Sequence, residues 1–176
     1  MIRHLAKKLN KLAREDVRMR RNYQKGVPLD KNADKRRTAA LKVIINRHGW
    51  PTIPLVGEKA SRNAWLIAQH ADHDRRFQTR ALKLLTTAYQ EDQRNIDPTN
   101  IAYLTDRLLV ASGRKQEFGT QFKFDKRGAL KLCPLRNPKT IDATRNRYHL
   151  PPLRRSLKEA EAYNKYRGRS CRRLPA

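Results

Sequence analysis

The chain has 176 residues, with 41 Lys and Arg against 16 Asp and Glu, and a net charge of +25. This length fits one domain with or without tails, and no segment approaches the roughly 20 apolar residues of a membrane helix, so we predict no membrane span. The N-terminal segment lacks the apolar core and cleavage site of a secretory signal, so we expect a cytoplasmic protein. Its basic, amphipathic character leaves organellar targeting as the alternative.

The first half of the chain predicts four helices. Apolar residues recur at every third or fourth position from Ile2 to Leu12, opposite a face of lysines and arginines. Asp30 and Asp74 are suitable N-caps for two of the helices, and a proline-containing loop precedes the most apolar helix, which we expect to be central and buried. The expected helices cover residues 2–24, 31–48, 58–71 and 75–90.

The second half predicts one hairpin and three more helices, of which the last two run from Asn137 to about Arg147 and over about 155–166. Pro98 opens a fifth helix that ends at Gly113. The apolar pattern then alternates on both sides of a turn, which predicts a β-hairpin at about 118–132. The sequence thus predicts a mainly α protein, a compact bundle of about six to seven helices with one small β-hairpin. We expect a single helical domain over 1–157 and a basic C-terminal helix and tail over 158–176.

A first cluster of chemically active residues follows the buried helix directly, in the segment 69–74. In one interpretation His70 is a general acid or base with Asp74 as its partner, and Gln69 contacts the ligand. In a second, His70 and His73 bind a divalent metal, but a third firm ligand is missing from the local pattern. In a third, His70 ends one helix and Asp74 caps the next.

Two further clusters of polar residues lie later in the chain. Asp106 and Arg107 lie on the fifth helix, where an arginine aimed at an anionic ligand is one interpretation and a buried ion pair is the other. Gln116, Thr120 and Gln121 lie between this helix and the hairpin. Their uncharged hydrogen-bonding groups suit a polar ligand, or they satisfy the backbone of their own loop.

The chain resembles a bacterial domain family of unknown function. Short sequence motifs, in the same order as in the family, carry this resemblance over roughly residues 5–157. Glu15, Asp16 and Arg20 also fit the pattern of the family's first helix. The chain departs from the family at Phe118, where a tyrosine is expected, and in its much more basic character. The resemblance implies a helical fold with a small hairpin and a shared polar pocket, but no activity. The motifs are HGWP (48–51), LVG (55–57), AWLI with QH (64–70), FQ (77–78), YL with DR (103–107), GTQF (119–122) and LPPL (150–153).

Three functions remain open from the sequence. The first is a hydrolase or transferase acting on a phosphorylated or nucleotide-like compound, an anionic small molecule. The second is an accessory protein that binds RNA or DNA through phosphate contacts, since a charge of +25 attracts polyanions. The third is a helical protein-interaction module. No phosphate-binding glycine loop, nucleophile elbow or Rossmann fingerprint narrows the choice.

Overall fold

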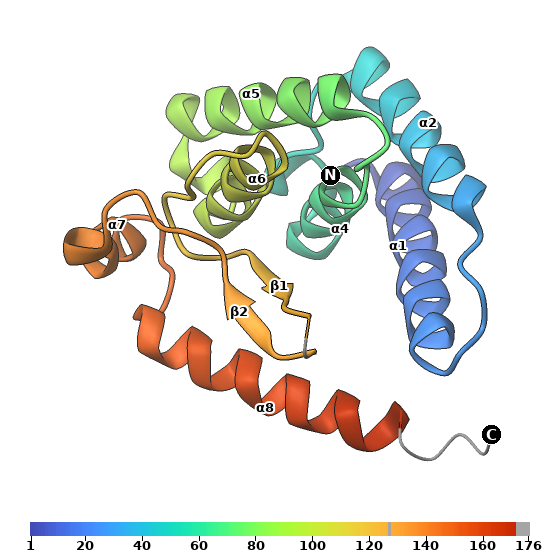
Figure 1. Cartoon of the computed structure of the whole chain (residues 1–176). Coiled ribbons are helices and arrows are strands. Elements are labelled where there is room, and N and C mark those ends of the chain that lie inside the picture. Colours follow the sequence, from blue (N-terminus) through green and yellow to red (C-terminus); the bar gives the residue numbers. More distant parts are fainter. Residues whose placement is uncertain (127, 172–176) are drawn as a thin grey trace. The chain divides into compact units, whose positions relative to one another are not determined.

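The computed structural model describes residues 1–126 and 128–171, without the side chains of Lys31 and of residues 163–171. The fold is mainly helical, with a two-stranded antiparallel hairpin, as predicted (Figure 1). None of the described helices is long and apolar enough to span a membrane. The chain divides into two compact units, Met1–Leu104 and Thr105–Ala176. The predicted boundary at 157 falls inside the last helix, and the single domain over 1–157 stays a prediction.

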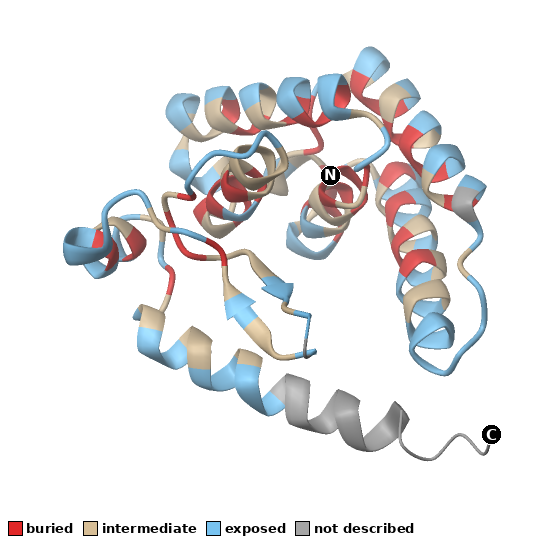
Figure 2. Ribbon diagram, in the orientation of Figure 1, coloured by how far each residue is buried: buried red, intermediate tan, exposed pale blue. Residues whose placement is uncertain are grey.

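The first unit is built around one buried helix. Helix α4 contacts α1, α2, α3 and α5, which confirms its predicted central position. Buried positions follow one side of α1 while the other side is exposed (Figure 2). The apolar core therefore forms where the helices meet α4. The helices are α1 (Arg3–Gln24), α2 (Lys31–His48), α3 (Ile53–Val56), α4 (Glu58–Gln69), α5 (Arg75–Glu91) and the first part of α6 (Pro98–Ala111), with a 3₁₀ turn at Gln93–Asn95.

The helix boundaries follow the capping signals closely. The side chain of Asp30 accepts a hydrogen bond from the Asn32 amide at the start of α2, and that of Asp74 accepts one from the Phe77 amide at the start of α5. The predicted proline-containing loop is wrong at residues 53–56, which form the one-turn helix α3. Pro54 is compatible with this turn because proline fits the first turn of a helix.

Helices α1 and α4 run parallel to each other. Asn10 contacts Asn63, 53 residues further along the chain, and Asp16 contacts His70, 54 residues further along. A nearly constant offset means that the two helices advance in the same direction, side by side. This pairing decides which polar side chains of α1 and α4 meet.

The second unit is built on the remainder of α6, a loop and the hairpin. Strands β1 (Phe122–Phe124) and β2 (Leu130–Leu132) pair antiparallel, with Lys123 opposite Lys131. The strands are shorter than the predicted hairpin because residues 118–121 form part of the loop. A 3₁₀ turn (Pro138–Thr140), α7 (Ile141–Asn146) and α8 (Leu153–Cys171) follow, and α8 packs on β2.

Candidate functional site

A network of charged residues surrounds a buried carboxylate in the first unit. Asp16 on α1 is only 1% exposed, and its Oδ2 lies 2.8 Å from His70 Nδ1 and 3.2 Å from Arg20 Nε. Its Oδ1 lies 3.3 Å from Nη2 of Arg37, a buried residue of α2. The carboxylate of Asp16 therefore holds groups from α2 and from the end of α4 against α1.

A second carboxylate completes the network. Asp34 on α2 accepts from Arg37 Nη2 at 2.6 Å and from Arg20 Nη2 at 3.2 Å to each oxygen. Two carboxylates thus share two guanidinium groups. Charged groups away from water are costly unless paired in this way, so the network links α1, α2 and α4 in one arrangement.

The electrostatics of the network fix the protonation of Asp16. Burial raises the pKa of Asp16, but the hydrogen bond and charge of His70, together with Arg20, outweigh it and leave the pKa below its ordinary value. The ionised carboxylate accepts a hydrogen bond from an Nδ1–H of His70, which leaves Nε2 with a lone pair when the ring is neutral. Arg20 Nε lies 3.0 Å from Nδ1 and can donate there in the other tautomer. An aspartate that orients a half-exposed histidine is an arrangement suited to acid–base chemistry.

The predicted pairing of His70 with Asp74 is wrong. Asp74 Oδ1 accepts from the Phe77 amide at 2.9 Å, and its Oδ2 lies 2.5 Å from Lys42 Nζ. The hydrogen bonds from Lys42 and Phe77 hold the pKa of Asp74 below its ordinary value. The alternative interpretation, in which Asp74 caps α5, is confirmed, and the carboxylate partner of His70 is Asp16.

The other predicted residues of this segment have different surroundings. Gln69 is 6% exposed, and its side-chain Oε1 is buried without a hydrogen-bond partner among the described residues. His73 is exposed. Within residues 1–126 and 128–162, no group of three or more His, Cys, Asp or Glu side chains is placed to hold a metal ion.

In the second unit, Asp106 organises the loop before the hairpin. It is fully buried and accepts hydrogen bonds from the amides of Glu117 (2.7 Å), Phe118 (3.0 Å) and Thr120 (2.9 Å), and from Thr120 Oγ1 (3.0 Å). Burial raises the pKa of Asp106, although the backbone hydrogen bonds act in the opposite direction. The Asp106 carboxylate therefore acts on the protein's own loop.

The glutamines of this loop also serve its backbone. Gln116 is fully buried, its Nε2 donates to the carbonyls of Gln121 (3.1 Å) and Cys133 (2.7 Å), and its Oε1 accepts from the Gln121 amide (2.9 Å). Gln121 Nε2 donates to Thr120 Oγ1 at 3.1 Å. The interpretation in which the amides satisfy their own loop is confirmed for Gln116. Arg107 on α6 is half-buried.

Arg145, which sequence reasoning missed, holds the other side of the same loop. It is 1% exposed and donates to the carbonyls of Phe118, Gly119 (3.3 Å) and Pro151 (2.7 Å), and to Ser156 Oγ (2.6 Å). The one signal in the sequence for Arg145 is that a charged residue occupies an apolar position of a short helix.

Phe118, where the chain departs from the family pattern, is 4% exposed and packs edge-on against Tyr148, with 4.7 Å between the ring centroids.

The predicted site residues fall into both units, with Gln69, His70 and Asp74 in the first and the other five in the second. The ligand-binding roles predicted for them stay predictions.

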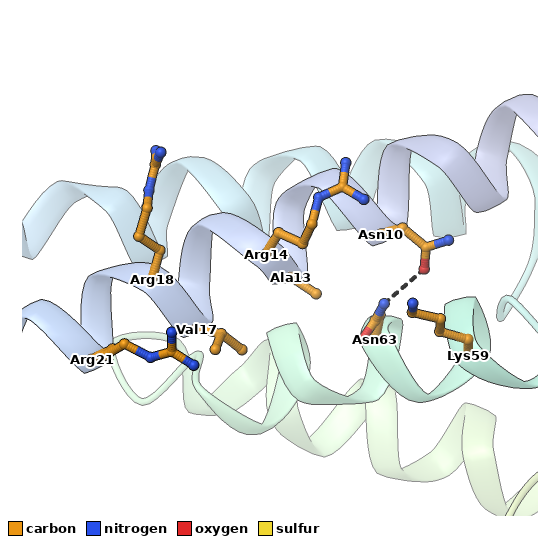
Figure 3. A pocket seen from close by; sticks show the side chains of 8 residues that line it. All are labelled: Asn10, Ala13, Arg14, Val17, Arg18, Arg21, Lys59 and Asn63. Atoms are coloured by element: carbon orange, nitrogen blue, oxygen red, sulfur yellow. Dashed lines mark hydrogen bonds between the residues drawn. The ribbon is translucent and has the colours of Figure 1, made fainter.

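A cationic groove between α1 and α4 was not predicted as a site. It has a volume of about 460 Å³ and is lined by the exposed cations Arg14, Arg18, Arg21 and Lys59 over Ala13 and Val17 (Figure 3). Asn63 Nδ2 donates to Asn10 Oδ1 at 2.7 Å at one end. Helical periodicity indicated the basic face of α1, but only the packing on α4 makes it a groove.

Among the residues that the structure describes, the four cations of the groove have no acidic partner. No ion pair joins Arg14, Arg18, Arg21 or Lys59 to any side chain in the described part of the chain, and no carboxylate lines the groove. In contrast, Arg20 of α1 and Arg37 of α2 pair with Asp16 and Asp34. The charged side chains that line the groove are thus all cationic.

Comparison with known proteins agrees with the resemblance seen in the sequence. Comparisons with curated proteins and with solved structures gave no match. A family model described as a family of unknown function, DUF6624, matches residues 29–166, which include α2 to α7 and most of the described α8 but not α1. Because this match covers more than three quarters of the sequence, the chain belongs to the DUF6624 family of unknown function.

Proposed function

We propose that the protein binds phosphate-rich polyanions, RNA in the first place, through the groove between α1 and α4. The observation that carries this proposal is the row of four exposed, unpaired cations lining one groove without a carboxylate. Arg14, Arg18 and Arg21 are spaced four and three residues apart, so they lie on one face of α1. Lys59 faces them from α4.

The energetics of such binding come from released counterions. Each phosphate neutralised on a single strand contributes about −0.7 to the slope of log K against log salt concentration. If all four cations contact phosphates, we expect a slope of about −3. Replacing two of them should make the slope less steep by about 1.4.

The test compares two double variants of equal charge. Arg14→Gln with Arg21→Gln removes two groove cations spaced seven residues apart. Arg76→Gln with Lys83→Gln removes two exposed cations with the same spacing on α5, outside the groove. Fluorescence anisotropy with a labelled RNA between 50 and 400 mM KCl (about the range where such effects are large) gives affinity and slope. The groove pair should weaken binding and flatten the slope more than the control pair. Equal effects would mean that the charge acts diffusely and would overturn the proposal.

A second candidate function rests on the Asp16–His70 pair. The contact of 2.8 Å between Asp16 Oδ2 and His70 Nδ1 favours acid–base catalysis by His70, with Asp16 as its positioning residue. The substrate class would be a phosphorylated or nucleotide-like compound, handled by a hydrolase or transferase reaction.

This second candidate is tested by turnover and by the tautomer of His70. Hydrolysis of p-nitrophenyl phosphate and of nucleotides should be abolished in His70→Gln and reduced in Asp16→Asn, with His73→Gln as the exposed-histidine control. The ¹⁵N shifts of the His70 ring should report an Nδ1–H tautomer in the wild type that is lost in Asp16→Asn. Wild-type protein that turns over none of these compounds would exclude the reaction class for them.

A further inference from the structure

The groove between α1 and α4 has an apolar floor beneath its cationic rim. Val17 is 48% exposed although it lies between Arg14, Arg18 and Arg21 on α1. An adjoining cavity of about 580 Å³ shares Val17, Lys59 and Asn63 with the groove. Its lining adds the side chains of Trp65 and Leu66, together with the charged residues Glu58 and Arg62. A purely electrostatic phosphate site has no need of such a floor.

A polar pair closes one end of the same floor. Asn10 and Asn63 share one hydrogen bond of 2.7 Å, in which Nδ2 of Asn63 donates and Oδ1 of Asn10 accepts. Each amide group has a carbonyl oxygen and an NH₂ group. The pair therefore retains donors on Asn10 and an acceptor on Asn63 for a third group. Base edges of nucleic acids offer the matching donors and acceptors.

These features distinguish two kinds of nucleic acid. A duplex turns its phosphates outward and keeps its bases stacked inside, so a duplex over the groove can reach the rim cations but not the floor. A single strand has unstacked bases, which proteins hold on apolar surfaces while cations follow the backbone. The volume of about 460 Å³ lies within the usual range of small-ligand sites, which suits one or two nucleotides.

We propose that the groove between α1 and α4 binds single-stranded nucleic acid, with a base against Val17 and the phosphates on the rim cations. This inference rests on the proposed polyanion binding and adds the substrate class. The rim cations supply affinity for phosphates, and the apolar floor supplies the preference for single strands. The Asn10–Asn63 pair contacts a base edge. Charge complementarity favours this occupant over a basic or neutral partner, since every charged residue lining the groove is a cation.

The test uses the full-length protein and three probes: a single-stranded 12-nucleotide RNA, the duplex of the same sequence and a glutamate polymer of equal charge. Val17→Ser removes apolar contact without changing charge, and Val43→Ser is the matched control, since Val43 is 59% exposed on α2 and does not line the groove. Val17→Ser should weaken single-strand binding about fifteenfold, as expected for the loss of two buried methyl groups, and leave duplex binding unchanged. Val43→Ser should change neither.

The outcomes separate this inference from the function on which it rests. If Arg14→Gln with Arg21→Gln weakens RNA binding but Val17→Ser does not, the polyanion site stands and the single-strand preference is refuted. If the double charge variant has no specific effect, the proposed function itself fails. Equal binding of the RNA strand, the duplex and the glutamate polymer would also overturn the inference, because charge alone would then account for all binding.

Discussion

Replacement of Asp106 by asparagine tests what holds the loop between α6 and the hairpin. The carboxylate accepts from the amides of Glu117, Phe118 and Thr120, and from the Thr120 hydroxyl. Asparagine has nearly the same shape but keeps only one acceptor oxygen. If that oxygen stays with Glu117 and Phe118, the NH₂ group faces the Thr120 amide, which is itself a donor.

Two opposing effects set the size of the change. A buried donor that loses its acceptor costs about 1–3 kcal/mol, and hydrogen bonds to a charged acceptor are stronger than those to a neutral one. Against this, burial raises the pKa of Asp106, so a neutral side chain avoids part of a desolvation cost. The Thr120 hydroxyl can rotate and accept from the new NH₂ group. We therefore expect Asp106→Asn to lower the free energy of unfolding by about 1–2 kcal/mol.

Urea unfolding and amide hydrogen exchange measure the two parts of this prediction. The unfolding midpoint should fall, and exchange of the Thr120 amide should accelerate more than exchange of the Glu117 amide. Thr120→Val is the control, because it removes the hydroxyl donor and keeps the amide, at a cost of about 0.5–1 kcal/mol. A more stable Asp106→Asn protein with unchanged exchange would show that desolvation of the carboxylate outweighs its hydrogen bonds, and would refute the reasoning.

Three further substitutions test the buried groups Asp16 and Arg145 and the backbone turn at Gly119. The pKa of Asp16 lies below its ordinary value of 3.8, so its ionisation stabilises the fold above that value and the contribution disappears as pH falls through the lower folded pKa. Asp16→Asn should thus be less stable at neutral pH and lose less stability on acidification below about pH 4, as followed by urea unfolding; equal acid sensitivity would contradict this. Gly119 has φ +69°, and an added Cβ would lie 2.9 Å from Leu153 Cδ1, so Gly119→Ala should cost about 1–3 kcal/mol in thermal unfolding. Arg145→Lys replaces a planar group with several donors by a single ammonium and should cost about 2–4 kcal/mol, whereas the exposed Arg147→Lys should leave stability unchanged; similar losses in both would argue against a special role of Arg145.

The sequence was sufficient for the elements that depend on local physics. Helix α2 begins at the Asp30 cap and α5 at the Asp74 cap, as their side chains and the apolar spacing predicted. The hairpin follows from alternation around a tight turn. Capping, periodicity and turn chemistry act over a few residues, so no knowledge of the tertiary structure is needed to recognise them.

The limits of sequence reasoning lie where groups far apart in the chain meet. Asp74 is only four residues from His70, but its carboxylate is used by the start of α5 and by Lys42. The carboxylate that reaches His70 is Asp16, 54 residues earlier. Likewise, the loop residues that cover Asp106 and bond to its carboxylate lie 11 to 14 positions later in the chain.

The amino-acid sequence alone therefore determined the longer helices, the hairpin, the family and the excess of positive charge. The tertiary structure alone decided the parallel packing of α1 on α4, which brings Asp16 to His70 on one side of α1 and leaves the cations of Arg14, Arg18 and Arg21 along a groove on another. The physical reason is that a helix face is a local property, while its partner is chosen by which apolar surfaces bury one another across the whole unit.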